Sequence, residues 1–425
     1  MFGVTLFAVF FALVFLNIPI AVALGLSSLT GLYMADFSFA MFPSIIYTAI
    51  GRFALLAIPF FILAGTIMEY AGISRRLIRF AYVCVGHRKG GLISVVVVVS
   101  CFFAAISGSG PATVAALGGV LIPAMAEAGY DKAMATALIS ASGGMGIIIP
   151  PSIAFVVYAS IADVSVGALF SGGFIPGLIV GFAYYLSAMY MARNDTGITR
   201  FEKASMKERW LAFKDTFWGL MTPVIILGGI YGGIYTPTEA AGVAVVYGLF
   251  VGLFIYKEIK IGDLWKLCVD AAISSGVVMF IVAGASTFAW LLTTTHVASN
   301  ISSAIMGFGA DKVTMLLLIN VIFLITGLFL DANSAFYILI PIMMPVITAF
   351  KIDPVHFGVF VTVNMAIGLI TPPVAINLFV GCNIAQLSMT DVYKKSVPFV
   401  VAGVIALLVI TFIPEITLFI PRFLR

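Results

Sequence analysis

Two proline pairs lie deep inside apolar stretches, where they would leave backbone oxygen atoms free to bind an ion. The hexapeptide Gly146-Ile-Ile-Ile-Pro-Pro151 returns 222 residues later (368 − 146) as Gly368-Leu-Ile-Thr-Pro-Pro373. Proline has no N–H and clashes with the carbonyl four residues earlier, so each pair is expected to break a helix. The carbonyls of Gly146 and Ile147, and those of Gly368 and Leu369, then lack their helical donors. Free carbonyls beside an unwound helix are typical ligands of Na⁺ in transporters.

The two expected breaks also expose the starts of new half-helices, near Ser152 and Val374. The positive dipole end of a helix attracts anions. Polar residues precede both breaks at matching places, because Asn364 lies 222 residues after Ser142 (364 − 142). Each break therefore predicts oxygen ligands for a cation on one side and an anion-binding helix start on the other.

A second kind of turn is expected at Ser107-Gly-Ser-Gly-Pro-Ala-Thr113. The glycines allow a tight reversal, Ser109 can cap the next helix, and proline suits its first turn. The surrounding apolar stretch, 91–128, is about 38 residues long, which fits two half-helices better than one span of about 20. We expect a re-entrant hairpin with its tip at 107–113. The alternative is a helix interface built from small residues.

The matching tip in the second half is expected at Leu330-Asp-Ala-Asn-Ser334. Asp331 follows an apolar run, and an acidic residue at membrane depth points to function, as a cation ligand, a helix cap or both. Plain capping at a water-exposed turn is the alternative. These four segments predict two cation sites, each made by one hairpin tip and one broken helix, with an organic anion between them.

The candidate residues fall into two sets. The expected cation ligands are Ser107, Ser109, Ser142, Gly143, Gly146, Asp331, Asn333, Asn364 and Gly368. The residues expected around the organic anion are Gly110, Thr113, Pro150, Ser152, Ser334, Thr371 and Pro373. No relay of acids and histidines is evident, so we expect Na⁺, in two or more copies, as the coupling ion, and no organic cofactor.

Composition places the chain in a lipid bilayer. Hydrophobic residues make up 62% of it and charged residues 9%, against an apolar share of about 45–50% in ordinary domains. The four cysteines and three histidines are scattered, without the spacing of metal ligands or disulfides. The net charge of +4 is small and indicates no nucleic-acid partner. We expect an all-α, multi-pass protein of the inner-membrane type that is not an enzyme.

Three basic loops set the expected orientation. They cover 74–89, 193–215 and 257–266, and short basic loops face the cytoplasm. Tracing the apolar segments from these loops sends 44–70 inward and its counterpart 270–293 outward. The two halves of the chain are therefore expected to be inverted relative to each other.

Further matches support a duplication. Phe61-Ile-Leu-Ala-Gly65 matches Phe280-Ile-Val-Ala-Gly284 at an offset of 219 residues (280 − 61). Ordered matches at a nearly constant offset are typical of an internal repeat, and inverted repeats are common in transporters. The stretches 72–89 and 296–312 precede the two hairpins as amphipathic arms or as simple loops. The expected parts are an N-terminal scaffold helix (1–43), a first repeat (44–192), a cytoplasmic loop with linking helices (193–269) and a second repeat (270–425).

Over essentially its whole length the chain resembles the large, DctM-like membrane subunit of the tripartite ATP-independent periplasmic (TRAP) transporters. The resemblance rests on Ser107–Thr113, Gly143–Ser152, Thr236–Ala241 and Gly368–Pro373. It implies the fold of the ion transporter superfamily, in which a hairpin-bearing transport domain moves as an elevator against a scaffold. It also implies import of carboxylate-bearing solutes across the bacterial inner membrane, driven by a Na⁺ gradient.

The resemblance implies two protein partners. A periplasmic substrate-binding protein would deliver the solute, and a small membrane subunit of four helices would pack beside this chain. The family's substrates include C4-dicarboxylates and sialic acid. Overall similarity favours sialic acid, although no single residue carries that preference.

Two other functions stay open as alternatives. A passive channel can also be built from paired inverted hairpins, but it would conduct without a partner protein. An intramembrane hydrolase would use Ser109 as its nucleophile and would need a base beside it. The three histidines are expected in loops, away from that position.

Overall fold

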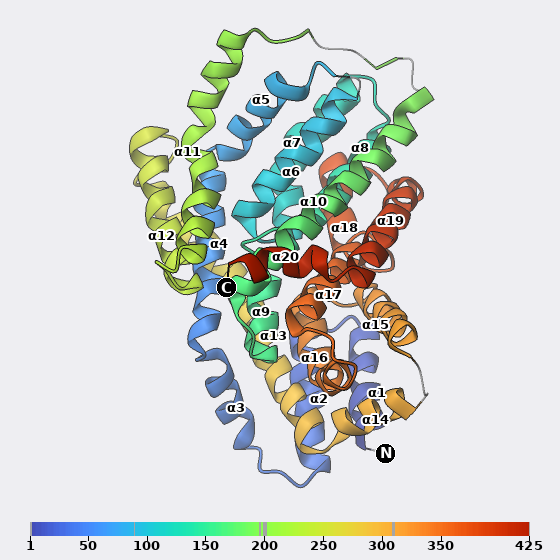
Figure 1. Ribbon diagram of the computed structural model, residues 1–425. Coiled ribbons are helices and arrows are strands. Elements are labelled where there is room, and N and C mark those ends of the chain that lie inside the picture. Colours follow the sequence, from blue (N-terminus) through green and yellow to red (C-terminus); the bar gives the residue numbers. More distant parts are fainter. Residues whose placement is uncertain (1, 89, 195–196, 199–201, 308–310, 425) are drawn as a thin grey trace.

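The computed structural model describes every residue except 1, 89, 195–196, 199–201, 308–310 and 425, and its regular elements are all helices (Figure 1). Two helices, α1 (Phe2–Phe15) and α2 (Ile20–Met34), lie where one helix was expected over 1–43. Between them Asn17 takes a left-handed conformation, with a φ of 62°, and Pro19 supplies no N–H. Both features end a helix, which explains the difference.

The first half of the chain contains a hairpin and a broken helix. The hairpin expected at 91–128 is a pair of helices that reverses at Gly108, whose φ of 62° suits glycine. The elements, in order, are α3 (Met41–Ile50), η1 (Phe53–Leu56), α4 (Ala57–Tyr70), α5 (Ile73–Val85), α6 (Gly91–Ser107), α7 (Gly110–Glu127), α8 (Lys132–Gly143), η2 (Gly144–Ile147), α9 (Ile153–Ala162) and α10 (Val166–Met191).

A linking unit follows, comprising η3 (Ala192–Asn194), α11 (Met206–Tyr231), α12 (Pro237–Phe250) and the short π-helix η4 (Val251–Ile255). Helix α12 begins with a capping box in which Thr236 and Glu239 bond to each other's backbone N–H groups. Glu239 therefore serves as the capping acid of this helix. Helices α11 and α12 stand side by side at one edge of the molecule (Figure 1).

The second half repeats the order of the first. A long helix, a short arm, a hairpin, a helix broken at a proline pair and another long helix follow one another. The elements are α13 (Asp263–Thr294), α14 (Val297–Gly307), α15 (Lys312–Gly327), α16 (Ala332–Ala349), α17 (Pro354–Gly368), α18 (Ile376–Ala385) and α19 (Met389–Phe412), with α20 (Glu415–Phe423) at the end.

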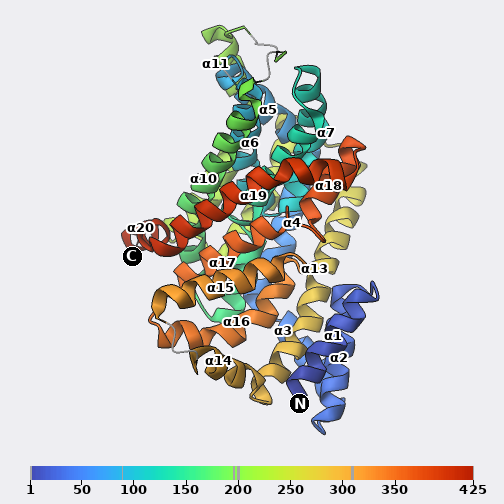
Figure 2. The same ribbon diagram turned by 90° about the vertical axis from the view of Figure 1, so that its right-hand side faces the viewer.

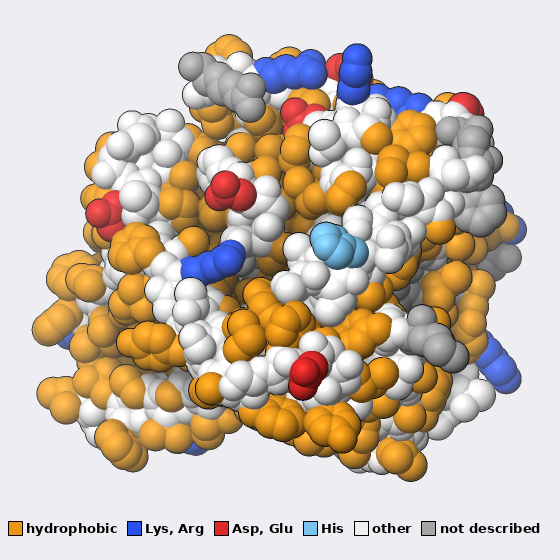
Figure 3. All heavy atoms as spheres, turned by 90° about the horizontal axis from the view of Figure 1, so that it is seen from below, with side chains coloured by type: hydrophobic (Ala, Val, Ile, Leu, Met, Phe, Trp, Pro, Cys, Tyr) orange, Lys and Arg blue, Asp and Glu red, His pale blue; other side chains and the backbone are white. Residues whose placement is uncertain are grey.

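Eight helices of the described residues are long and apolar enough to cross a membrane. They are α7, α10, α11, α13, α16, α19, η1 with α4, and α12 with η4. Hydrophobic side chains cover much of the face seen from the end that carries α14, with only scattered charges (Figure 3). The protein is thus a multi-pass membrane protein.

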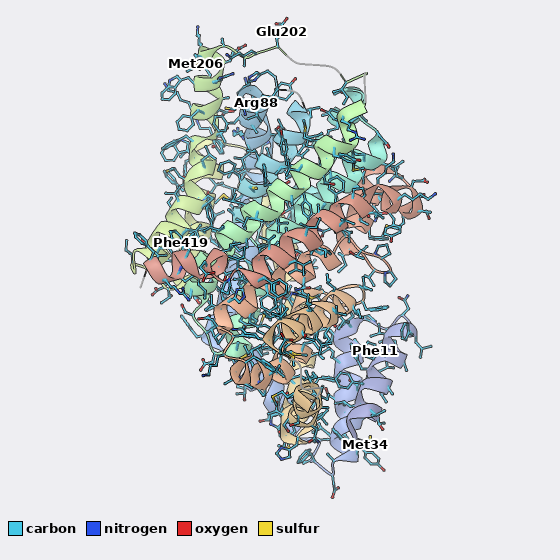
Figure 4. All side chains as sticks on the ribbon, turned by 45° about the vertical axis from the view of Figure 1, so that its right-hand side comes forward. Phe11, Met34, Arg88, Glu202, Met206 and Phe419 are labelled. Atoms are coloured by element: carbon cyan, nitrogen blue, oxygen red, sulfur yellow. The ribbon has the colours of Figure 1, made fainter. Side chains whose placement is uncertain are left out.

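The two broken helices form the centre of the molecule. Every residue of α17 from Val355 to Gly368 is buried, as is every residue of α8 from Met134 to Gly143. The long helix α13 packs against α2, α3 and α4 on one side and against α16 on the other. Arg88 and Glu202 lie at one end of the molecule and Met34 at the opposite end (Figure 4).

The first arm, α5, is fastened to the linking unit by Arg76. Its guanidinium donates to Glu258 at 3.0 Å and to Asp215 at 3.3 Å, and it lies over the ring of Tyr256 at 4.0 Å. The hydroxyl of Thr216 donates to the carbonyl of Arg76 at 3.0 Å. Four contacts at one residue fix this end of the arm to α11 and to the segment after α12. Figure 2 shows α5 beside α11.

Candidate functional site

The first hairpin tip is closed by its own hydroxyl groups. Ser107 Oγ lies 2.8 Å from Thr113 Oγ1, which donates to the carbonyl of Ser109 at 2.8 Å. The break of the first half packs directly on this turn. A Cβ atom added to Gly146 would lie 2.6 Å from the carbonyl oxygen of Ser109, so only glycine permits the contact.

The second hairpin tip is closed by Asp331. One carboxylate oxygen accepts from the N–H of Asn333 at 3.0 Å, and the other accepts from the hydroxyl of Ser334. The capping role expected for Asp331 is therefore confirmed. The break of the second half packs just as closely on the second hairpin, since a Cβ atom on Gly368 would lie 2.6 Å from the carbonyl oxygen of Gly327.

Each hairpin is also joined to the segment that follows its proline pair. The N–H of Ile153 donates to the carbonyl of Gly108 at 3.3 Å, and the N–H of Val374 donates to the carbonyl of Leu328 at 3.2 Å. The two bonds occupy corresponding places in the two halves. Each tip and its broken helix therefore form one connected unit.

Both tips and both breaks meet around a cavity of about 140 Å³. Three of the expected ligands, Ser109, Asp331 and Asn333, lie in its wall. The remaining wall is largely apolar and consists of Gly108, Pro111, Ile147, Ile153, Ala154, Val278, Ala332, Leu369 and Ile376.

A larger cavity of about 610 Å³ adjoins the first and shares Ser109 in its wall. It lies between the first hairpin and the helices α4 and α13. Glu69, Tyr70 and Asp270 line its far part, where the hydroxyl of Tyr70 donates to Asp270 at 2.6 Å. These three positions were not predicted from the sequence.

Buried oxygen atoms without a protein partner occur at three of the expected cation ligands. Within the described residues, Ser142 Oγ, Asn333 Oδ1 and Asn364 Oδ1 accept and donate no hydrogen bond. The amide nitrogen of Asn364 is used, because it donates to Asn320 at 2.8 Å. Burying a polar oxygen destabilises the fold unless a hydrogen-bond donor or a cation pairs with it. Hard oxygen ligands suit a small cation. Oxygen donors of the kind that Na⁺ prefers are thus present at both breaks and at the second tip.

The expectation that the proline pairs leave free carbonyls is wrong at three positions. The carbonyl of Gly368 accepts from the N–H of Thr371 at 3.0 Å, and that of Leu369 accepts from the N–H of Asn377 at 3.0 Å. The carbonyl of Ile147 accepts from the hydroxyl of Ser152 at 2.6 Å. A tight turn and a side chain replace the lost helical donors. Since a carbonyl oxygen has two lone pairs, Gly368 stays a predicted ion ligand.

None of the seven residues expected around the anion lines either of the two cavities. Gly110 and Thr113 belong to the first tip, and Ser334 is held by Asp331. Ser152 caps α9, and the hydroxyl of Thr371 donates to the carbonyl of Ile367 at 2.8 Å. The walls of the two cavities are formed by their neighbours. Pro150 and Pro373 belong to the cis proline pairs.

Sequence reasoning also missed Asn377. Its side-chain nitrogen donates to the carbonyl of Ser140 at 3.0 Å, and its Oδ1 is buried without a partner in the described part of the chain. A lone amide four residues after the second proline pair, inside an apolar segment, was the available signal.

Comparison with known families decides the class of protein. Residues 7–416 match the family model described as "Tripartite ATP-independent periplasmic transporter, DctM component". The chain belongs to the DctM family. The resemblance seen in the sequence is confirmed, and the members named below are transporter permeases rather than enzymes.

Three relatives illustrate the range of the DctM family. The isethionate TRAP transporter permease DctMQ of Oleidesulfovibrio alaskensis is 41% identical over 97% of this chain, which spans 65% of that protein. The C4-dicarboxylate large permease DctM of Rhodobacter capsulatus is 36% identical over all of both chains. The sialic acid permease SiaT of Haemophilus influenzae is 34% identical over 98% of this chain and 68% of its own length.

A solved structure shares the fold. The Alcanivorax borkumensis YdaH transporter superposes with a TM-score of 0.62 over 90% of this chain and 88% of its own, at 15% sequence identity. At this identity the likeness concerns the fold alone. It supports the all-helical membrane architecture.

Proposed function

We propose that this DctM-family permease imports an organic anion by Na⁺ symport. The observation that carries the proposal is the pairing of each hairpin tip with its own broken helix around one cavity. Buried, unpartnered oxygens at Ser142, Asn333 and Asn364 are suited to Na⁺, and the Asp331 carboxylate adds a negative charge. Two Na⁺ sites flanking one anion site follow from this arrangement.

The anion would bind between the two Na⁺ sites. Among the residues that the structure describes, no lysine or arginine contributes to the walls of the two cavities described above. Helix starts at α7, α9 and α16 converge there instead, and their N–H groups favour a carboxylate or sulfonate. Bound Na⁺ would offset the charge of Asp331, so that the anion enters after the ions.

The proposed mechanism is an elevator motion of an inverted repeat. The hairpins, broken helices, α10 and α19 would move against a scaffold of α1–α4 and α11–α13. With the basic loops at the cytoplasm, the larger cavity leads from Ser109 past Asp270 to the inner side. At the other end of α4, the Arg52 guanidinium bonds to the carbonyl of Ser160 in α9. In the proposed mechanism, this arrangement would be the inward-facing state.

The proposed setting is the bacterial inner membrane, with two further components of the transport system. A periplasmic substrate-binding protein would deliver the anion, and a small four-helix subunit would pack beside the scaffold. The substrate class is a small organic acid. Sialic acid, favoured from the sequence, competes with C4-dicarboxylates and isethionate, which the relatives above are named for.

Uptake into proteoliposomes tests the proposal. The chain is reconstituted with the small subunit, and radiolabelled succinate, isethionate or N-acetylneuraminate is supplied with the cognate binding protein. We expect uptake that requires an inward Na⁺ gradient and the binding protein, and that increases with an inside-negative potential. Uptake that does not depend on Na⁺ would refute symport and indicate uniport. Ion conductance by the chain alone would indicate a channel.

A further inference from the structure

Asn377 lies where the two halves of the molecule touch. It is the second residue of α18, just past the second break, and its side chain is fully buried. Its backbone N–H donates to the carbonyl of Leu369 across that break at 3.0 Å. Its side-chain nitrogen donates to the carbonyl of Ser140 in α8 at 3.0 Å. One residue thus binds the second break and the helix leading into the first.

The other atom of the amide faces the first hairpin. A Cβ atom on Gly110 would lie 3.1 Å from Asn377 Oδ1, and one on Gly143 would lie 3.3 Å from Asn377 Nδ2 and 3.1 Å from the carbonyl oxygen of Gly110. Three segments therefore meet at one amide. Since Oδ1 has no hydrogen-bond partner among the described residues, this end of the side chain is held by packing alone.

We infer that Asn377 couples the two Na⁺ sites, so that occupancy of one raises the affinity of the other. This inference rests on the proposed Na⁺ symport. The Asn377 amide holds the start of α18 at a fixed distance from Ser140 and Gly143, which border the first site. The same residue holds Leu369, beside the second site. An ion that orders the first tip and α8 therefore also orders the second break, and the second ion meets a site already arranged.

The coupling is asymmetric in the chain. Position 155, which corresponds to Asn377 at an offset of 222 (377 − 155), is the fully buried Phe155. The first half thus has no amide at this place. The side chain that joins the sites belongs to the second half alone, and its loss cannot be replaced by its counterpart.

Equilibrium binding of ²²Na⁺ to the purified permease, without transport, tests the inference. In the wild type we expect a Hill coefficient approaching about 2, because two coupled sites limit it to that value. Asn377→Leu keeps the size of the side chain and removes both polar atoms. We expect a Hill coefficient near 1 and second-ion binding weakened about tenfold, within the usual range of coupling between sites. Asn383→Leu, exposed on the same helix, is the control and should match the wild type.

The outcomes separate coupling from simple damage. A wild-type Hill coefficient in Asn377→Leu would overturn the inference. Equally weakened binding of both ions, with cooperativity retained, would overturn it too. Asn377→Ser is too short to reach Ser140 but keeps a polar group, and it should show the same loss of cooperativity if the leucine variant does not fold. Absence of Na⁺ binding in the wild type would instead refute the proposed symport.

Discussion

Replacing Gly146 by alanine tests the contact between the first hairpin tip and the first break. The new methyl group would lie 2.6 Å from the carbonyl oxygen of Ser109 and 2.8 Å from Thr113 Oγ1. Ordinary contact begins near 3.4 Å, so the tip must retreat by about 0.8 Å (3.4 − 2.6). The obstacle is backbone, which cannot rotate away as a side chain would.

The displacement should weaken Na⁺ binding. Overpacking of a close contact costs about 1–3 kcal/mol. If the ion-bound state requires the contact, that cost corresponds to roughly 5- to 150-fold weaker binding. Gly368→Ala meets the carbonyl oxygen of Gly327 at the same 2.6 Å and should have an effect of similar size.

The assay is the Na⁺ concentration that gives half-maximal uptake in proteoliposomes at saturating substrate. Gly119→Ala is the matched control, because a Cβ atom at this position of α7 would meet no atom within 4 Å beyond the adjoining backbone of its own helix. It should keep the wild-type value. A Na⁺ requirement within twofold of the wild type in both Gly146→Ala and Gly368→Ala would refute the idea that the tips and breaks form the ion sites.

Three further predictions concern the arm, the second hairpin tip and a surface ion pair. Arg76→Ala should lower the melting temperature by an amount corresponding to roughly 1–3 kcal/mol, whereas the exposed Arg79→Ala should not; equal melting of the two variants would contradict the anchoring role. Asp331→Asn keeps a good helix cap, so stability should hold while the half-maximal Na⁺ concentration for uptake rises about tenfold; an unchanged Na⁺ requirement would remove Asp331 from the ion site. Burial favours the neutral form of Asp131, but hydrogen bonds from Lys395 and a backbone N–H prevail and hold its pKa below the usual value. The contribution of Asp131 to the free energy of unfolding is therefore complete above a pH of about 4. It is lost as the pH falls through the lower pKa of the folded state. Asp131→Asn should lose less melting temperature between pH 7 and pH 3 than the wild type, and identical losses would argue against the pair.

The features that break a helix were the most predictable from the sequence. Two proline pairs at corresponding positions predicted the ends of α8 and α17, and the Gly-Ser-Gly sequence predicted the turn between α6 and α7. Asp331 was predictable because a carboxylate inside an apolar run has few uses. Such signals are local, since they depend on backbone chemistry within a few residues.

The contacts between distant segments could not be predicted in this way. Asn377 meets Ser140, which lies 237 residues earlier, and only the packing of α18 on α8 brings them together. The carbonyl of Gly368 was expected to be free, but the chain after it closes a turn whose N–H groups a sequence pattern does not reveal. The acidic wall at Glu69 and Asp270 likewise exists only because α4 and α13 are neighbours.

One backbone hydrogen bond joins each hairpin to the segment after its proline pair. These two bonds have a consequence for how such permeases diversify. They run between main-chain atoms of Gly108 and Ile153 in one half and of Leu328 and Val374 in the other. Apart from the glycine that the turn at position 108 requires, these bonds need no particular side chain. Substitutions in the cavity wall can therefore alter what is carried while the mechanical link between tip and break persists. Divergence of the cavity wall among such permeases therefore need not disturb the backbone bonds between tip and break.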